Sequence, residues 1–253
     1  MVIDSHAHLE CKMDTEEIIK NMHQDGLEKI VTIGTDRKDS ISAVKLAEKH
    51  NDVYATVGLH PEYVDDITEE DLEVVDKLAE HQKVVAIGEI GLDYHYTEHN
   101  KEAQKELFIK QIMMAYRHKL PLVIHCRDAK EDMYEILSKY KQYIIKPSVM
   151  HCFSEDREYA LKFLELGFYI SFAGNITFKK SDRSFLKDIP IDKILVETDA
   201  PYLSPEPFRG MQNVPARANI TAEKIADTLE MDAETFKKQT IENTYKVFYR
   251  MKR

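Results

Sequence analysis

Histidine and acidic residues recur directly after short apolar runs of this 253-residue chain. His6 and His8 close the first run, and later runs are followed by further residues of these two kinds: His60, Glu89, His125, His151 and Asp199. Imidazole and carboxylate groups are common protein ligands of divalent metals. If the runs are parallel strands of a barrel, their carboxyl ends meet at one rim. The pattern therefore predicts a metal centre assembled from residues that are far apart in the sequence.

The first strand carries a spacing that is typical of a chelate. Residues two apart in a strand share a face, so Asp4, His6 and His8 are predicted to point together into the mouth of a barrel. A surface coincidence is the alternative, which the apolar strand and the neighbouring acid disfavour. The same alternation turns Cys126 and Cys152 away from the face that the preceding histidines use. Both thiols are therefore predicted to be small buried hydrophobic groups rather than ligands.

Three carboxylates lie where a buried charge needs a partner. Glu89 ends an apolar strand, where an ionised carboxylate is costly unless it is paired or bound to metal. A bridge between two cations is the functional interpretation, and a buried ion pair is the structural one. Asp199 is interpreted as a metal ligand and a general base. Glu197 shares its face one layer deeper, and it either supports a metal ligand from behind or forms a purely structural salt bridge.

Other polar residues at the same rim are candidates for binding substrate. His60 precedes Pro61, which restricts it to an extended backbone, and a structural role is nearly as well supported as contact with substrate. Arg127 directly follows the fifth apolar run, and Arg209 lies in the loop after the eighth. Guanidinium groups match phosphate oxygens in bidentate fashion, so both arginines are predicted to hold an anionic substrate.

Four imidazoles and two carboxylates exceed the three protein ligands that usually hold one catalytic zinc ion. They suit two divalent ions that share a bridging carboxylate and lie about 3.5–4 Å apart, an arrangement that clamps both oxygens of an in-line displacement. Imidazole-rich ligation favours Zn, Mn, Co or Ni over Mg by affinity, although availability can decide otherwise. The residues therefore predict a metal-dependent hydrolase in which Asp199 orients or deprotonates the attacking water.

Short apolar runs alternate with longer amphipathic stretches along the chain, which is typical of buried parallel strands separated by helices. Asp14, Thr68 and Asp128 each precede an acidic residue by three positions and are predicted to cap helices. A (β/α)8 barrel of the TIM type is expected, with a doubly wound open sheet as the competing fold. Two extra helices are expected in the tail from Ala216 to Arg253. The eight predicted strands are Val2–Ile3, Lys29–Ile33, Val53–Val57, Val84–Ile87, Leu122–Ile124, Ser148–Met150, Phe168–Phe172 and Ile194–Val196.

Composition excludes several classes of protein. The formal net charge of −10 argues against a protein that coats nucleic acid through a broad basic face, but permits a local phosphate site. No apolar run is long enough to span a membrane, and the N-terminus has no features of a signal peptide, so a cytoplasmic location is expected. No linker or shift in composition marks a boundary, and residues 1–253 are expected to form a single domain.

Six segments of the chain resemble the TatD family of metal-dependent deoxyribonucleases, in the same order as in that family. The resemblance extends from Asp4 to about Phe248 and implies DNA phosphodiester hydrolysis, often from the 3′ end of single strands. It also implies that Glu89 bridges two divalent ions, with no obligate protein partner. The implied metal ligands are His6, His8, Glu89, His125, His151 and Asp199. The segments are Asp-Ser-His-Ala-His-Leu at 4–9, Gly-Leu-His-Pro at 58–61, Gly-Glu-Ile-Gly-Leu-Asp-Tyr at 88–94, His-Cys-Arg-Asp-Ala at 125–129, His-Cys-Phe-Ser at 151–154 and Glu-Thr-Asp-Ala-Pro-Tyr-Leu-Ser-Pro at 197–205.

Two departures from the family pattern bear on substrate preference. Glu155 stands where the family usually has Gly, and Arg217 stands where a Tyr usually follows the 209–215 loop. Hydrolysis of an amide or an aminoacyl ester is therefore kept as an alternative, because related barrels share the His-x-His strand. Many of those relatives bridge their metals with a carboxylated Lys, whereas the fourth strand here ends in Glu89. A metal-binding protein without catalysis is a further alternative, which the intact ligand set disfavours.

Overall fold

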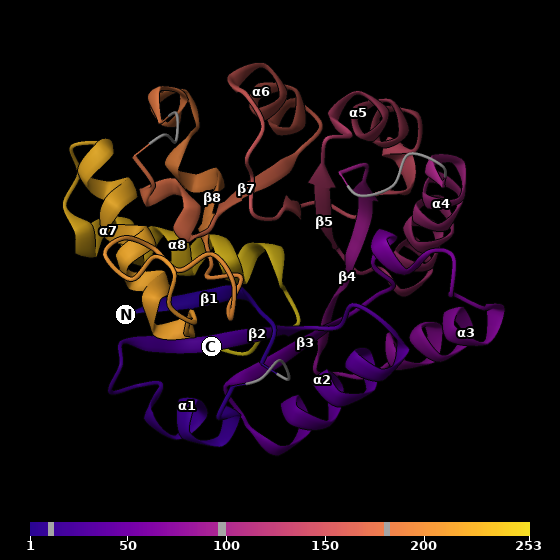
Figure 1. Cartoon of the computed structure of the whole chain (residues 1–253), viewed down its shortest axis with the longest axis horizontal. Helices are drawn as coiled ribbons and strands as arrows, with labels where there is room; N and C mark the ends of the chain where they lie inside the picture. The colour runs from indigo at the N-terminus through magenta and orange to yellow at the C-terminus, as the bar shows by residue number, and fades with distance from the viewer. Residues whose placement is uncertain (10–12, 96–99, 180–182) are drawn as a thin grey trace.

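Eight parallel strands follow one another around a barrel in the order in which they occur in the sequence (Figure 1). The computed structural model describes residues 1–9, 13–95, 100–179 and 183–253. Each predicted apolar run lies within one strand, and a bridge between Ala7 and Ala200 links the first strand to the segment after the last. The predicted (β/α)8 barrel is confirmed, since an open doubly wound sheet would show crossovers in its strand order. The strands are β1 (Val2–Ala7), β2 (Leu27–Ile33), β3 (Val53–Val57), β4 (Val84–Asp93), β5 (Leu122–Arg127), β6 (Ser148–Met150), β7 (Phe168–Phe172) and β8 (Ile194–Val196).

Helices connect most of the strands and cover the outside of the barrel (Figure 1). Within the described ranges, the connection between β7 and β8 contains only short 3₁₀ turns in place of a helix. Across the same ranges, no helix combines the length and the apolar character that a membrane span requires. The helices are α1 (Thr15–Asn21), α2 (Arg37–Lys49), α3 (Glu69–Leu78), α4 (Lys101–His118), α5 (Lys130–Lys139), α6 (Arg157–Glu165), α7 (Ala218–Thr228) and α8 (Ala233–Val247).

The predicted capping residues begin helices in two of the three cases. Asp14 caps α1, and Thr68 forms a full capping box at the start of α3. The prediction for Asp128 is wrong, because α5 begins at Lys130 and its cap position makes no side-chain hydrogen bond. The Asp128 carboxylate instead lies 2.8 Å from Nδ1 of His95. This acid therefore ties together two loops of the rim rather than a helix end.

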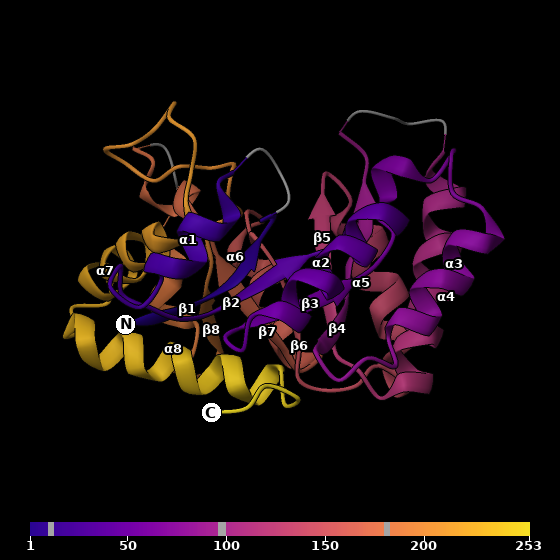
Figure 2. The same ribbon diagram turned by 90° about the horizontal axis from the view of Figure 1, so that it is seen from below.

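Strand side chains fill the interior of the barrel, and residues at and beyond the end of α8 cover it at the amino end of the strands. Val247, Phe248 and Met251, which lie at and beyond the end of α8, belong to one buried cluster with strand residues such as Ile3 and Tyr54. Figure 2 shows α8 crossing beneath the strands, on the side opposite most of the long loops. Burial of these large side chains excludes water from the lower barrel. The carboxyl end is thereby left as the accessible rim.

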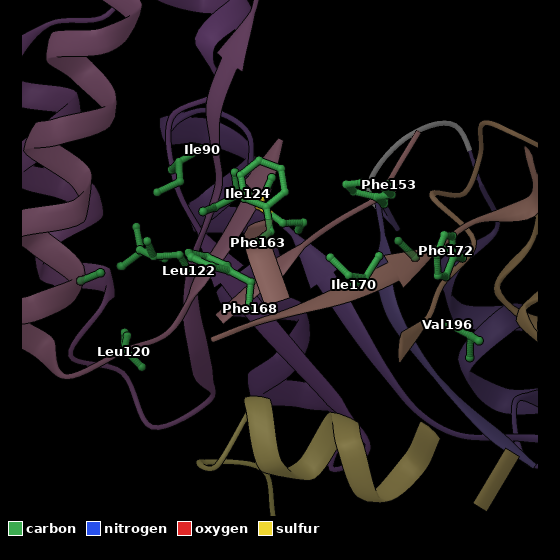
Figure 3. Close-up of a cluster of buried hydrophobic side chains, with 14 of the residues drawn as sticks. Ile90, Leu120, Leu122, Ile124, Phe153, Phe163, Phe168, Ile170, Phe172 and Val196 are labelled. Atoms are coloured by element: carbon green, nitrogen blue, oxygen red, sulfur yellow. The ribbon is translucent and has the colours of Figure 1, made fainter. Parts of the chain in front are cut away.

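A second hydrophobic layer lies between the sheet and the outer helices. Phe163 of α6 is fully buried among strand residues such as Ile124 and Phe168 (Figure 3). The rings of Phe163 and Phe168 meet edge to face, with their centroids 6.4 Å apart. Such interlocked packing fixes the directions of β5 to β8. The residues that follow these strands are consequently held on a rigid frame.

Candidate metal centre

His6 and His8 lie at the carboxyl end of β1, with their imidazoles in the mouth of the barrel. The pairing of β1 with β2 shifts between Asp4 and Ala7, so β1 contains one more residue than its partner over this stretch. The predicted common face is therefore wrong for Asp4, because the extra residue changes the alternation. Its carboxylate instead accepts hydrogen bonds from the backbone N of Thr198 at 3.0 Å and from its hydroxyl at 2.5 Å.

Glu89 occupies the middle of the site and presents its two oxygens to different imidazoles. Oε2 lies 3.3 Å from Nε2 of His6 and 3.7 Å from Nε2 of His8. Oε1 lies 2.8 Å from Nε2 of His151 and 3.0 Å from Nδ1 of His125. A carboxylate that faces two separate donor groups has the geometry of a bridging ligand. The structure thus brings the predicted bridging residue between two pairs of histidines.

Asp199 joins this arrangement from the segment after β8. Its Oδ1 lies 3.2 Å from Nε2 of His8 and 3.7 Å from Nε2 of His6. The backbone has a left-handed φ of 55°, which is uncommon for a residue other than glycine and often marks functional sites. A hydrogen bond from its backbone N to the carbonyl of His6 at 2.9 Å fixes this conformation. Asp199 is therefore held beside the two histidines of β1.

Glu197 supports His151 from within the barrel. Its Oε1 lies 3.3 Å from Nδ1 of His151, on the opposite side of the ring from the nitrogen that faces Glu89. The carboxylate also accepts hydrogen bonds from the backbone N of Cys152 at 2.6 Å and from the hydroxyl of Ser171 at 2.5 Å. The geometry matches a carboxylate that orients a metal-binding imidazole. The carboxylate thus lies behind a candidate ligand and also within ion-pair distance of it.

Asp93 has the same relation to His125, and the sequence analysis missed it. Its Oδ2 lies 2.9 Å from Nε2 of His125, and its backbone N donates to Oε1 of Gln104 at 2.8 Å. The predicted strand ended at Ile87, whereas β4 continues to Asp93. An acid four positions after Glu89 lies on the same strand face, so this spacing could have identified it.

His60 borders the site but differs from the other histidines. Its Nδ1 accepts a hydrogen bond from the backbone N of Glu62 at 3.2 Å, so the ring proton of the neutral form lies on Nε2. That nitrogen points at Oε1 of Glu89, 3.5 Å away. His60 therefore offers a hydrogen-bond donor to the centre of the site rather than a lone pair for a cation.

Burial and charge act against each other in this cluster. Burial alone would raise the pKa of Glu89, but the charges of His151, His60 and His6 hold that pKa well below its usual value. Burial lowers the pKa of His6, and the nearby His151 lowers it further. Burial alone would raise the pKa of Asp199, and its hydrogen bond to His8 keeps that pKa below the ordinary value. Two ionised carboxylates thus lie among largely desolvated imidazoles.

The donor set fits divalent cations. The His6 side chain has no exposed surface, yet neither of its ring nitrogens forms a hydrogen bond. A buried polar atom without a partner is costly, and a cation on Nε2 would satisfy it. Three groups have ligand atoms within 4.8 Å of one another. The first two groups are His6, Glu89 and His151, and His6, His8 and Asp199. The third group is His60, Glu89 and His125, in which the Nδ1 lone pair of His60 is already used by the backbone N of Glu62.

The site opens into a cavity of about 500 Å³ at the carboxyl end of the barrel. Arg127 lines this cavity, as does each of the two cysteines that follow the histidines. The prediction that the thiols turn away from the site is confirmed for Cys126, which packs against the outer core. It is wrong for Cys152, which lies beyond the end of β6, where strand alternation no longer applies. Its Sγ lies 3.9 Å from Nδ2 of Asn175, another residue of the cavity wall. Arg209 is not among the lining residues, and its guanidinium lies 4.4 Å from the ring centroid of Phe178.

A parallel barrel with a carboxylate-bridged imidazole cluster at its rim defines a metal-dependent hydrolase. Comparison with known proteins gives the family: the family model of TatD related DNases matches residues 3–249. The chain is 42% identical to the uncharacterized metal-dependent hydrolase YabD of Bacillus subtilis, covering 98% of this chain and 99% of that protein. It is 35% identical to YcfH of Escherichia coli, covering 98% and 96%. The chain belongs to the TatD family.

Solved structures agree with this assignment. The crystal structure of YJJV, a TatD homolog from Escherichia coli, superposes with a TM-score of 0.92 at 28% identity, covering 98% of each chain. An organophosphorus hydrolase from Deinococcus radiodurans gives a TM-score of 0.65 at 10% identity, covering 98% of this chain and 92% of that chain. The second likeness shows a shared fold alone.

The two departures from the family pattern have visible structural consequences. Arg217 donates from Nη1 to the hydroxyl of Ser204 at 2.9 Å and to the carbonyl of Gln212 at 2.6 Å, which pins the loop after β8. Its guanidinium lies 4.3 Å from the ring centroid of Phe208. Glu155 is partly buried, and this burial raises the pKa of its carboxyl. Neither residue lines the cavity, so both act at a distance from the candidate ligands.

Proposed function

We propose that this chain is a deoxyribonuclease that uses two divalent ions to remove nucleotides from the 3′ end of single-stranded DNA. The observation that carries the proposal is that the two oxygens of Glu89 face different pairs of histidines. Oε2 faces His6 and His8, and Oε1 faces His125 and His151. Two cations sharing one carboxylate suit an in-line displacement at phosphorus. The family description, TatD related DNases, supports DNA as the substrate class.

The six candidate ligands have distinct tasks in this proposal. His6, His8 and Asp199 would hold one ion, His125 and His151 the other, and Glu89 both. When bound, the ions supply Lewis-acid activation of the phosphate and of the nucleophile. Imidazole-rich ligation favours Zn, Mn, Co or Ni over Mg by affinity.

The remaining steps belong to side chains of the chain itself. Asp199 is ionised at neutral pH, as its lowered pKa indicates, and accepts the proton of the attacking water. His60 lines the cavity and is proposed to contact the substrate phosphate through Nε2, which faces Oε1 of Glu89 in this structure. Arg127 holds a phosphate of the strand, because its side chain lines the same cavity. Arg209 is proposed to contact the strand farther from the cavity.

The charge of the chain favours strand ends over long duplexes. With a formal net charge of −10, the molecule has no broad basic face that could neutralise many phosphates. A 500 Å³ cavity with one arginine among its lining residues suits a single nucleotide at a chain end. We therefore propose weak, only modestly salt-dependent binding to long duplex DNA, and cleavage at single-stranded termini.

A metal-content measurement paired with a nuclease assay tests the proposal. The protein is stripped with a chelator and reloaded with Zn, Mn, Co, Ni or Mg, and each form is given single-stranded oligonucleotides labelled at either end. The proposal requires loss of cleavage on chelation, restoration by at least one metal, about two ions per chain, and stepwise shortening from the 3′ end. Turnover of an amide or aminoacyl ester without any cleavage of DNA would favour the alternative hydrolase.

A further inference from the structure

Two large aromatic side chains stand exposed at the mouth of the cavity. Tyr63 is 41% exposed and Tyr202 is 56% exposed, and both line the cavity. Tyr63 ends the 3₁₀ turn Pro61–Tyr63 after β3, and Tyr202 follows Asp199 after β8. The backbone N of Tyr202 donates to the carbonyl of Asp199 at 2.8 Å, which ties this ring to the metal centre. Exposed aromatic rings beside a polar site are suited to stacking on a flat ligand.

Both rings lie directly beside histidines of the site. The centroids of Tyr63 and His60 are 6.2 Å apart, and those of Tyr202 and His8 are 6.0 Å apart, in each case edge to face. Burial raises the pKa of the Tyr63 phenol, and the nearby Glu62 carboxylate raises it further. The two tyrosines thus line one cavity beside His60 and His8, and both of these histidines lie against Glu89.

The cavity wall is acidic near the tyrosines and basic farther round the rim. Glu62 lines the cavity next to Tyr63 in the sequence, and Asp39 lines it from the first turn of α2, whereas Arg127 lines it from the end of β5. Glu62 follows β3, which lies two places from β5 in the order of the strands. Phosphate groups are therefore attracted toward Arg127 and repelled from Glu62. A group that suits the acidic side carries hydrogen-bond donors.

We propose that Tyr63 and Tyr202 clamp the base of the terminal nucleotide, and that Glu62 accepts a hydrogen bond from its amino group. This inference rests on the proposed nuclease function and names the part of the substrate that the site selects. Cytosine, adenine and guanine carry amino groups, and thymine does not. The clamp therefore prefers the three amino-bearing bases at the terminus, while stacking alone accepts all four. Other rings of nearby loops, Phe178 and Phe208, do not line the cavity.

The first experiment compares two oligonucleotides that differ only at the 3′ terminal position, which is cytidine in one and an abasic tetrahydrofuran residue in the other. Base stacking on aromatic side chains predicts that kcat/KM of the wild-type protein falls at least about fivefold for the abasic end. The double variant Tyr63→Ala, Tyr202→Ala should lose this discrimination and cleave both substrates at the lower rate. Phe at both positions should restore it, because the ring faces remain.

Tyr116→Ala serves as the matched control, since this tyrosine is 45% exposed on α4 and does not line the cavity. The control should discriminate against the abasic end as the wild type does. Equal rates on the two substrates with the wild-type protein would overturn the clamp while leaving the nuclease proposal intact.

A second pair of substrates tests Glu62 separately. The wild-type protein should cleave a 3′ terminal cytidine about threefold or more faster than a 3′ terminal thymidine, as expected for one charge-assisted hydrogen bond. Glu62→Ala should remove this preference without removing the difference between cytidine and the abasic end. An unchanged preference in Glu62→Ala would overturn the role of Glu62.

Direct binding separates failure of the clamp from failure of the proposed function. Affinity for dCMP and for deoxyribose 5-phosphate is measured by calorimetry on the metal-loaded protein. Tighter binding of dCMP by at least about fivefold, lost in the double alanine variant, supports the clamp even if no oligonucleotide is cleaved. Equal affinity for the two ligands overturns the clamp regardless of activity.

Discussion

The two oxygens of Glu89 divide the candidate metal centre into unlike halves. The Oε2 half contains His6, His8 and Asp199, and neither ring nitrogen of His6 forms a hydrogen bond. The Oε1 half contains two histidines that each have a carboxylate behind the ring. In that half, Asp93 lies 2.9 Å from His125 and Glu197 lies 3.3 Å from His151.

We propose that the two halves have separate tasks. A carboxylate behind an imidazole fixes the orientation of the ring and makes its free nitrogen a stronger donor. The Oε1 half would therefore hold an ion in one geometry. The Oε2 half has fewer such constraints and contains a carboxylate of its own, Asp199. In this proposal the Oε1 half mainly holds an ion, and Asp199 of the Oε2 half accepts the proton.

Replacement of Glu89 should have the largest effect, because it acts on both halves at once. In Glu89→Gln one oxygen becomes an amide nitrogen that cannot ligate, so the shared bridge is lost. We expect metal content to fall from about two ions per chain to one or none, and nuclease activity to fall below detection. Metal content is measured by atomic emission after gel filtration.

The control for this variant is its fold, since Glu89 is buried beneath the cavity. Circular dichroism spectra of the metal-free proteins should agree between wild type and Glu89→Gln, which shows that the variant is folded. A folded variant that kept two ions and full activity would contradict the division of the centre into halves that share this residue.

Replacement of Asp199 should damage the Oε2 half alone. Asp199→Asn keeps the shape of the side chain but removes the base, so kcat should fall about 10²- to 10⁴-fold. The Oε1 half should still bind one ion with unchanged affinity, because its ligands and their supporting carboxylates remain. Titration with a chelating indicator measures this affinity, and a parallel loss of both ions would contradict the separation of tasks.

The six candidate ligands could be found from the sequence because a parallel barrel places every strand end at one rim. His125 and His151 could be predicted because each directly follows an apolar run, and both runs form strands as predicted. The predicted side-chain direction of Asp4 is wrong because one extra residue in β1 changes the alternation of the strand. Apolar periodicity contains no information about such a register shift. Register shifts of this kind depend on pairing with β2, which lies more than twenty positions away.

Asp93 and Cys152 show a different limit. The apolar run of β4 ends at Ile87, but hydrogen bonding to β5 continues to Asp93 through a glycine-containing stretch. At Cys152 the chain has left β6 with a left-handed φ of 44°, so the side chain reaches the cavity instead of the helices. Asp93 could have been found by continuing the alternation from Glu89, whereas the place of Cys152 depends on a turn of the backbone that hydrophobic patterns do not encode.

Removal of a supporting carboxylate should have a smaller effect, confined to the Oε1 half. Glu197→Gln or Asp93→Asn should weaken the binding of one ion about 10- to 100-fold and leave the other ion unchanged. Excess metal should then restore most of the activity, because neither residue touches the substrate in the proposed mechanism. Metal titration curves of activity and of binding provide the two readouts. Loss of activity that no metal concentration restores would show that these acids do more than position histidines.

The smallest effect is expected from the two arginines, which differ in their distance from both halves. Arg127 lines the cavity, whereas the guanidinium of Arg209 lies over Phe178 outside it. Arg127→Ala should raise KM for a single-stranded oligonucleotide about tenfold, as expected for the loss of one charge-assisted phosphate contact. Arg209→Ala should raise KM by a smaller factor, because its contact is farther from the scissile phosphate. A larger effect at Arg209 would mean that the DNA strand enters along the loop after β8. The proposed substrate path would then be wrong, whereas the division of the centre into two halves would be unaffected.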